Sequence, residues 1–173
     1  MTALNGAIVL GVDPGTATLG FAIVADVGRG ALRLIECGAV TTSPRDDLGS
    51  RLCALHDRLA DVIARTRPTE LAIERLFFSR NVTSALGVGQ ARGVAVLAAA
   101  QAGLTVHEYT PAEVKQAVAQ YGNARKEQIQ EMTRVILGLS DIPRPNDAAD
   151  AAAIAICHQH SRRAQILTGR MGS

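Results

Sequence analysis

The chain is poor in aromatic residues, and none of its hydrophobic runs is long enough to cross a bilayer. Aromatic residues make up 3% of the 173 residues and tryptophan is absent, so the core must be built from alanine, valine, leucine and isoleucine. The N-terminus lacks the basic region of a signal peptide. A composition of 47% hydrophobic and 20% charged residues excludes a disordered chain. We expect one domain spanning residues 1–173, located in the cytoplasm.

Cysteine is also scarce. Cys37, Cys53 and Cys157 are odd in number, widely spaced and set in apolar surroundings. This pattern excludes a disulfide framework and predicts buried free thiols in a reducing compartment.

Lysine is nearly absent, since 16 of the 18 basic residues are arginine. Lys115 and Lys126 are the exceptions, and they fall in one segment. A bias in base composition explains the arginines. The two remaining lysines are candidates for positions where a compact ammonium, which binds phosphate as a point charge, is not freely replaced by arginine. The net charge of +2 permits a nucleic-acid partner without demanding one.

Short apolar runs predict five strands. They are expected at residues 7–12, 19–25, 31–40, 70–76 and 104–108. The first three are joined by short connections and should form an antiparallel meander. The last two alternate with helices and should run parallel to the first strand. The sequence therefore predicts an α/β fold with a five-stranded mixed sheet and helices on both faces.

Helical periodicity and capping signals predict five helices. They are expected from Ser43 or Asp46 to 65, over 82–102, from the Thr110-Pro111 start to 120, over 124–137, and from an Asn146 or Asp147 cap to 163. Residues 164–173 are predicted to form a loose tail.

Four acidic residues border the predicted core: Asp13, Glu74, Asp147 and Asp150. Asp13 and Glu74 follow adjacent parallel strands, so they should reach the same edge of the sheet, where ligands bind in open α/β sheets. Asp147 and Asp150 are three residues apart and share one helix face. Such a cluster needs positive compensation, and hard oxygen ligands are typical of Mg²⁺ or Mn²⁺.

Each acid also has a purely structural interpretation. Asp13 could form the turn in the DPG segment, and Glu74 could pair with Arg75. Asp147 could be a helix N-cap, and Asp150 could be favoured by the helix dipole. These interpretations weaken when the four residues are taken together, because chance would have to place all of them at one edge.

Other residues leave two interpretations open. Phe77 and Phe78 lie in a predicted loop after the fourth strand. They could be core residues, or one of them could be an aromatic wedge that stacks on bases. The glycines of the next helix, Gly87, Gly89 and Gly93, indicate close packing, either on the chain's own sheet or at a dimer interface. The histidines at 107, 158 and 160 have no metal-like spacing with cysteine and are interpreted as ordinary core or surface residues.

Five segments resemble the RuvC family of bacterial Holliday junction resolvases. They are VLGVDPGTATLGFAIV, LAIERLFFSRN, GQARGVAVLAA, PAEVKQAVAQYGNARKEQIQEMTRVILGL and NDAADAAAIAICH, in that order. The match covers about residues 8–163. The resemblance implies a ribonuclease H-like fold and a homodimer that binds four-way junction DNA. Each subunit would nick one of two opposed strands and leave a 5′-phosphate, and a branch-migration motor of the RuvA and RuvB type would be a partner.

The resemblance also implies roles for individual residues. Asp13, Glu74, Asp147 and Asp150 match the four metal-binding acids, which would hold two Mg²⁺ or Mn²⁺ ions per subunit. One ion would activate a water and the other would stabilise the leaving oxygen. The resemblance implies catalytic or DNA-binding roles for six further residues: Lys115, Lys126, Arg125, Phe77, Phe78 and Arg80.

Two other functions are compatible with parts of the sequence. The DPGT turn at 13–16 is similar to the phosphate loop of the actin, Hsp70 and sugar-kinase superfamily, but those proteins need two such domains and are far longer. The other rival is a catalytically silent DNA-binding or scaffold protein of the same fold. The presence of all four acids counts against it.

Overall fold

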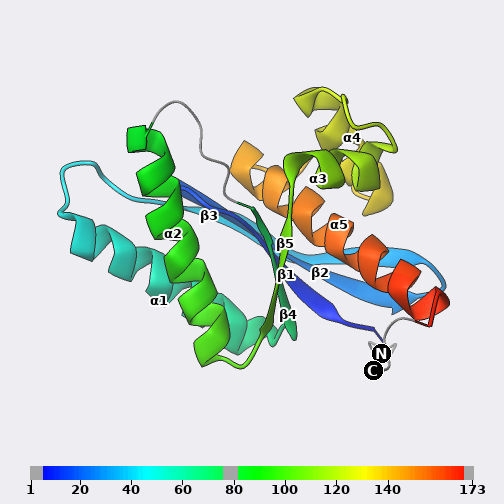
Figure 1. Cartoon of the computed structure of the whole chain (residues 1–173), viewed down its shortest axis with the longest axis horizontal. Coiled ribbons are helices and arrows are strands. Elements are labelled where there is room, and N and C mark those ends of the chain that lie inside the picture. The colour runs from blue at the N-terminus through cyan, green and yellow to red at the C-terminus, as the bar shows by residue number, and fades with distance from the viewer. Residues whose placement is uncertain (1–5, 76–81, 170–173) are drawn as a thin grey trace.

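Five strands form one mixed sheet in the computed structural model, which describes residues 6–75 and 82–169 (Figure 1). The strands are β1 (Ile8–Asp13), β2 (Thr18–Gly28), β3 (Ala31–Thr41), β4 (Glu70–Glu74) and β5 (Thr105–Tyr109). Their order in the sheet is β3-β2-β1-β4-β5. The α/β class and the five-stranded sheet are therefore confirmed.

The strand directions also follow the prediction. β1, β2 and β3 pair in antiparallel fashion, whereas β4 is parallel to β1 and β5 is parallel to β4. The β2–β3 turn works because Gly28, Arg29 and Gly30 all adopt positive φ angles of 87°, 53° and 89°. Two of these three positions are glycine, which adopts that conformation without steric cost.

Helices cover both faces of the sheet, as Figure 1 shows. They are α1 (Leu48–Thr66), α2 (Val82–Gln101), α3 (Pro111–Ala119), α4 (Lys126–Ile136) and α5 (Asn146–Leu167). One core lies between the sheet and α1 and α2, and the other lies between the sheet and α3, α4 and α5. None of the described helices is both long and apolar enough to span a membrane.

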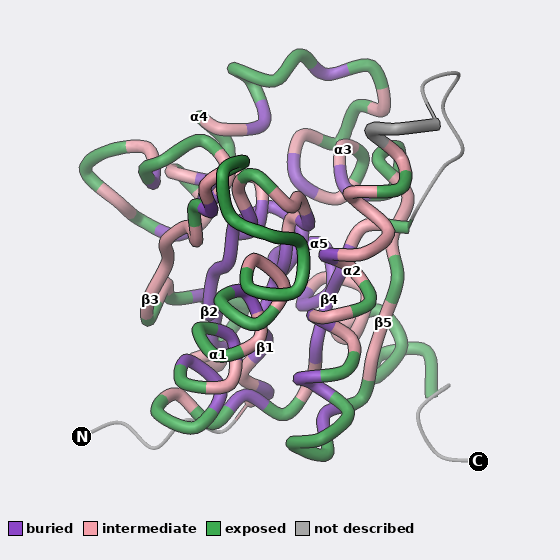
Figure 2. The backbone as a smooth tube through the Cα atoms, turned by 90° about the vertical axis from the view of Figure 1, so that its left-hand side faces the viewer, coloured by how far each residue is buried: buried purple, intermediate pink, exposed green. Residues whose placement is uncertain are grey.

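Alternation along β1 divides its side chains between the two cores. Leu10 and Val12 belong to the core under α1 and α2, whereas Val9 belongs to the core under α5. Because side chains alternate along a strand, Asp13 falls on the α5 side. Figure 2 shows the buried residues gathered along the central strands and α5.

The two ends of α5 differ from the prediction. Pro145 is the N-cap residue and no side chain caps the helix, so Asn146 and Asp147 already belong to its first turn. The expected cap at Asn146 or Asp147 is therefore wrong, and the Asp147 carboxylate is not used as a cap. The helix also continues to Leu167, four residues beyond its predicted end, so the tail is shorter than predicted.

Two further sequence-based expectations need correction. Helix α1 begins later than predicted, because Asp47 is its N-cap and accepts a hydrogen bond of 3.0 Å from the backbone N–H of Ser50. All three cysteines are free, but only Cys157 is buried. Cys37 is half-buried. Cys53 is exposed because it faces solvent beside the buried stripe of α1.

Candidate metal centre

Asp13 and Glu74 are the last residues of two adjacent parallel strands. In the β1–β4 register Val12 pairs with Ile73, so the two acids that follow leave the sheet side by side. Both are partly buried. The prediction that these carboxylates share one edge is confirmed, and that edge is the carboxyl end of the parallel strands.

Helix α5 brings Asp147 and Asp150 to the same edge because two glycines let it lie directly on the sheet. Gly20 is the cross-strand partner of Asp13. A Cβ atom at Gly20 would lie 2.1 Å from the backbone oxygen of Asp147, and one at Gly11 would lie 2.2 Å from that of Ala151. Any larger residue at either position would push the first turns of α5, and its acids, away from the sheet.

Burial and mutual repulsion disturb the ionisation of these acids. Burial, followed by the charges of Asp150, Glu74 and Asp147, raises the pKa of Asp13 to about 7, while Lys126 opposes the shift. Burial and then Asp150 also raise the pKa of Glu74, with Lys115 acting against them. The site therefore disfavours the charged form of both carboxylates, first through burial and then through the negative charge of their neighbours.

Lys126 partly compensates this charge. Its Nζ donates a hydrogen bond of 2.6 Å to Oδ2 of Asp150. This hydrogen bond is the largest of the effects that raise the pKa of Lys126, so the ammonium stays charged. Lys126 is the first residue of α4, which places one of the two lysines of the chain directly against the acidic cluster.

Lys115 reaches the cluster from α3. The N-terminus of α3 is fixed by a capping box, in which the Glu113 N–H donates to Thr110 Oγ1 over 3.1 Å and the Thr110 N–H donates to Glu113 Oε2 over 2.7 Å. The predicted Thr110-Pro111 helix start is therefore confirmed. The helix projects Lys115 into a cavity of about 210 Å³ that Glu74, Asp150 and Lys126 also line.

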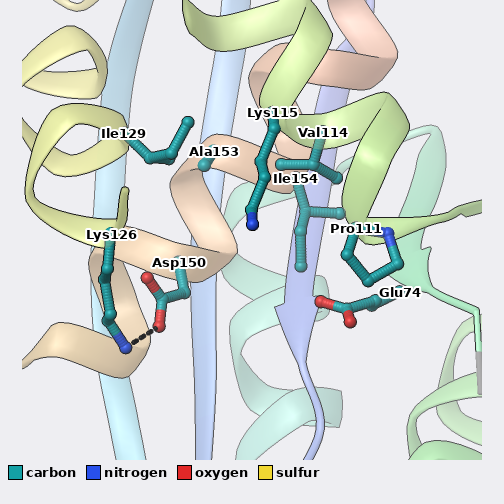
Figure 3. Close-up of a pocket in the computed structure, with 9 residues that line it drawn as sticks. All are labelled: Glu74, Pro111, Val114, Lys115, Lys126, Ile129, Asp150, Ala153 and Ile154. Carbon is teal, nitrogen blue, oxygen red and sulfur yellow. Dashed lines mark hydrogen bonds and ion pairs between the residues drawn. The ribbon is translucent and has the colours of Figure 1, made fainter. Parts of the chain in front are cut away.

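Figure 3 shows this cavity with Lys115 pointing into it and with Asp150 and Glu74 on either side in that view. The other lining residues are apolar: Pro111, Val114, Ile129, Ala153 and Ile154. Apolar walls lower the local dielectric constant and strengthen electrostatic interactions within the cavity. The two lysines and two of the acids therefore share one partly enclosed space.

The donor set fits divalent metal ions. All four side chains offer hard carboxylate oxygens, the ligands that Mg²⁺ and Mn²⁺ prefer. The raised pKa values of Asp13 and Glu74 reflect burial and, after it, repulsion by neighbouring carboxylates, and a bound divalent cation would compensate both effects. The arrangement is that expected of a metal-dependent site acting on phosphate esters, with lysines available to contact a phosphate.

The loop after Asp13 is braced from the opposite face of the sheet. Thr42 Oγ1 donates a hydrogen bond of 2.5 Å to the Thr16 carbonyl, and Arg51 Nε donates to Thr42 Oγ1 over 2.9 Å. A Cβ at Gly87 would lie 3.0 Å from Thr16 Oγ1. This glycine therefore serves packing within the chain, one of the two interpretations that the sequence left open.

Four other residues were predicted from the sequence to belong to the site. Arg125 is exposed at the N-cap position of α4, next to Lys126. Phe77, Phe78 and Arg80 lie outside the described residues.

Sequence reasoning missed a second group of polar side chains. Glu70, His107 and His158 offer ligand atoms that all lie within 4.8 Å of one another. Strand periodicity could have indicated the pairing of Glu70 and His107, because both fall on the α5 side of neighbouring strands. The spacing of the histidines along the chain contained no such signal.

The sheet order, with acids at the ends of its central strands, places the chain in the class of ribonuclease H-like proteins. The family model for crossover junction endodeoxyribonuclease RuvC matches residues 9–158, and the chain belongs to the RuvC family. A relative from Chloroflexus aurantiacus with that name is 59% identical over 152 residues, which cover 88% of this chain and 92% of the relative.

Solved structures agree with this assignment. The structure of Thermus thermophilus RuvC in complex with a Holliday junction substrate matches with a TM-score of 0.87 and 42% identity, and covers 91% of this chain and 96% of that chain. The yeast mitochondrial Holliday junction resolvase Ydc2 matches with a TM-score of 0.60 at 13% identity, covering 94% of this chain and 86% of that one. The second likeness concerns the fold alone.

Proposed function

We propose that this chain is a structure-selective endonuclease that resolves four-way DNA junctions in homologous recombination and repair. It acts by paired symmetrical nicks that leave 5′-phosphate ends. The observation that carries the proposal is the convergence of Asp13 and Glu74 with α5 at one sheet edge. The chain also belongs to the RuvC family, and a 42% identical member was solved with a Holliday junction.

Asp13, Glu74, Asp147 and Asp150 hold the metal ions in this proposal, two Mg²⁺ or Mn²⁺ per subunit. When bound, the ions supply an activated water and stabilise the leaving 3′-oxygen. Asp13 lies on the central strand and its pKa responds to all three other acids, which favours it as the residue shared by both ions.

The lysines act on the substrate. Lys115 extends into the cavity and supplies a positive charge for the scissile phosphate. Lys126 holds Asp150 through its ion pair and adds a second positive charge that offsets the charge developing in the transition state.

The other proposed DNA contacts are Arg125 and the segment that follows Glu74. Arg125 is exposed beside Lys126, where it can contact a backbone phosphate. Phe77, Phe78 and Arg80 follow Glu74 closely in sequence, and an aromatic residue there serves as the wedge at the junction centre.

Paired nicks require two acidic clusters, so we propose a homodimer. Helix α2 offers a surface for it, since Leu86 and Leu97 are 62% and 51% exposed and lie three helical turns apart on one side. Gly93 lies between them on the same side, and a Cβ there would meet no atom of the described chain within 4 Å. The dimer works in the cytoplasm with a branch-migration motor of the RuvA and RuvB type.

A synthetic four-way junction tests this function. We expect rapid nicking of two opposed strands in Mg²⁺ or Mn²⁺, nicks that a ligase can reseal because they carry 5′-phosphates, and no nicking in EDTA. A linear duplex of the same sequence serves as the control substrate. Equal cutting of duplex and junction, or cutting in EDTA, would overturn the proposal.

The same preparation distinguishes the rival functions. A silent junction-binding or scaffold protein would bind the junction and never cut it. An actin-like or Hsp70-like nucleotide-binding protein would be stabilised against heat by ATP, and we expect no such stabilisation.

A further inference from the structure

The partly buried polar group at the other end of β4, formed by Glu70, His107 and His158, has no part in the proposed nuclease reaction. Glu70 begins β4 and Glu74 ends it, so the two carboxylates are separated by roughly 13 Å along the strand. His158 follows Asp150 by eight residues on α5, which corresponds to about 12 Å of helix. The group therefore lies on the same face of the sheet as the acidic cluster, at the opposite end.

Both imidazoles of this group direct Nε2 at one carboxylate oxygen. His158 Nε2 is hydrogen-bonded to Glu70 Oε2, and His107 Nε2 lies 3.5 Å from the same oxygen. The two rings are 4.3 Å apart between centroids. A single ion placed among these three atoms would replace the contact between His158 and Glu70 and would use the lone pair of each imidazole.

Hydrogen bonds with Tyr109 and Arg162 already fix His158 Nδ1 and Glu70 Oε1, the atoms that are not directed at the shared position. Tyr109 Oη is 2.6 Å from His158 Nδ1, and Arg162 Nε donates to Glu70 Oε1 over 3.0 Å. Supporting hydrogen bonds of this kind orient histidine and carboxylate ligands in metal sites. The Tyr109 hydroxyl can donate or accept, so it suits either tautomer of His158.

We infer that Glu70, His107 and His158 form a binding site for a borderline transition-metal ion of the Zn²⁺ class, separate from the Mg²⁺ or Mn²⁺ centre. Two imidazoles and one carboxylate are a ligand set that suits Zn²⁺ and Co²⁺, whereas Mg²⁺ prefers oxygen ligands alone. Water fills the fourth position, reached past His107, whose side chain is 36% exposed.

The ion would join three elements of the fold. Glu70 belongs to β4, His107 to β5 and His158 to α5, so bound metal stabilises the folded state over the unfolded one. Arg162 remains next to the carboxylate and repels the cation, so binding is weaker than at structural sites with thiolate ligands. We expect micromolar rather than nanomolar affinity.

Titration with Co²⁺ followed by visible absorption tests this site, because four-coordinate Co²⁺ with imidazole ligands absorbs far more strongly in its d–d bands than six-coordinate Co²⁺ held by carboxylates and water. The protein should carry the Glu74→Gln substitution, which weakens the nuclease centre without touching this group. We expect one Co²⁺ per chain, displaced by Zn²⁺, and a rise in melting temperature on adding Zn²⁺.

The matched variants are His107→Gln and His56→Gln. Both histidines are partly exposed, and His56 lies on α1 beside Gln101, outside the group. His107→Gln should weaken Co²⁺ binding by at least about tenfold while His56→Gln leaves it unchanged. Equal affinity in the two variants, or an unchanged spectrum in His107→Gln, would overturn the inference, whether or not the protein cuts DNA.

Discussion

At the scale of single residues, Asp13 shows how the site opposes the stability of the fold. Its pKa of about 7 in the folded protein exceeds the ordinary value of 3.8 for an aspartate, so the folded state binds this proton more tightly than the unfolded state does. Its contribution therefore favours the folded state at acidic pH and declines as the pH rises from about 4 to about 7. At neutral pH the ionised Asp13 carboxylate therefore destabilises the metal-free protein, although the proposed reaction needs this carboxylate in its ionised form.

Asp13→Asn should therefore raise the melting temperature of the metal-free protein. In EDTA at about pH 8 we expect a gain of several degrees, which shrinks toward about pH 5, where Asp13 is already protonated. Calorimetry at the two pH values measures the effect. Glu36→Gln is the control, because Arg65 hydrogen-bonds Glu36 and holds the pKa of that carboxyl below its usual value. An unchanged or lower melting temperature for Asp13→Asn at about pH 8 contradicts the raised pKa described for Asp13.

Lys126→Gln should damage catalysis far more than folding. The ion pair with Asp150 is largely exposed, with 56% of the lysine side chain accessible, so its loss should cost less than about 1 kcal/mol of stability. We expect cleavage to slow by about 10²-fold or more under saturating junction, because a charge near the phosphate is lost. Single-turnover rates and melting curves provide the two measurements.

Arg125→Gln is the matched comparison for Lys126→Gln. Arg125 is the neighbouring residue and does not contact the acids, so its loss should weaken junction binding and reduce its salt dependence while the saturated rate stays near that of the parent. If both variants lose the same fraction of the saturated rate, Lys126 has no special part in the chemistry.

At the scale of secondary-structure elements, the position of α5 decides whether the site exists. The helix rests on Gly11 and Gly20, where a Cβ would collide with its backbone oxygens. Its core-facing residues are mostly alanine, which keeps the helix close to the sheet along its length. The two acids in its first turns are positioned by this contact, and no capping hydrogen bond from either side chain assists it.

Gly20→Ala should displace the start of α5 and with it Asp147. We expect cleavage to fall by about 10²-fold, because a shift of about 1 Å is enough to misplace catalytic groups. The melting temperature should also fall. Gly122→Ala is the control, since a Cβ there meets nothing within 4 Å and Gly122 has no positive φ. A Gly20→Ala protein that cuts junctions at the parent rate would show that the close approach of α5 is not required.

The same elements show which features were predictable from the sequence. The strands and the shared edge of Asp13 and Glu74 followed from apolar runs and parallel connections, which are local patterns. The start and end of α5 did not, because Pro145 starts the helix without a side-chain cap and burial carries it to Leu167. The Lys126–Asp150 pair and the approach of His158 to Glu70 depend on contacts between distant segments, and no spacing along the chain encodes them.

At the scale of the whole molecule, two symmetrical nicks require two acidic clusters. Each chain supplies one such cluster, so the reaction needs a second chain. We expect sedimentation to give twice the 18.1 kDa mass of the chain. Leu97→Glu should produce monomers, because it places a charge on the exposed apolar side of α2. Ala64→Glu on the exposed side of α1 is the control for a charge added elsewhere on the surface. A Leu97→Glu protein that remains dimeric would exclude α2 from the interface.

Cleavage of a four-way junction by single carboxylate-to-amide variants tests most directly whether the acidic cluster is the reaction centre. We predict two opposed nicks by the parent protein, and no cleavage above background by Asp13→Asn, Glu74→Gln or Asp150→Asn. Junction binding should persist in all of them, because the lysines and Arg125 are retained. Cleavage by Asp13→Asn at the rate of the parent would contradict the metal centre proposed at this edge of the sheet.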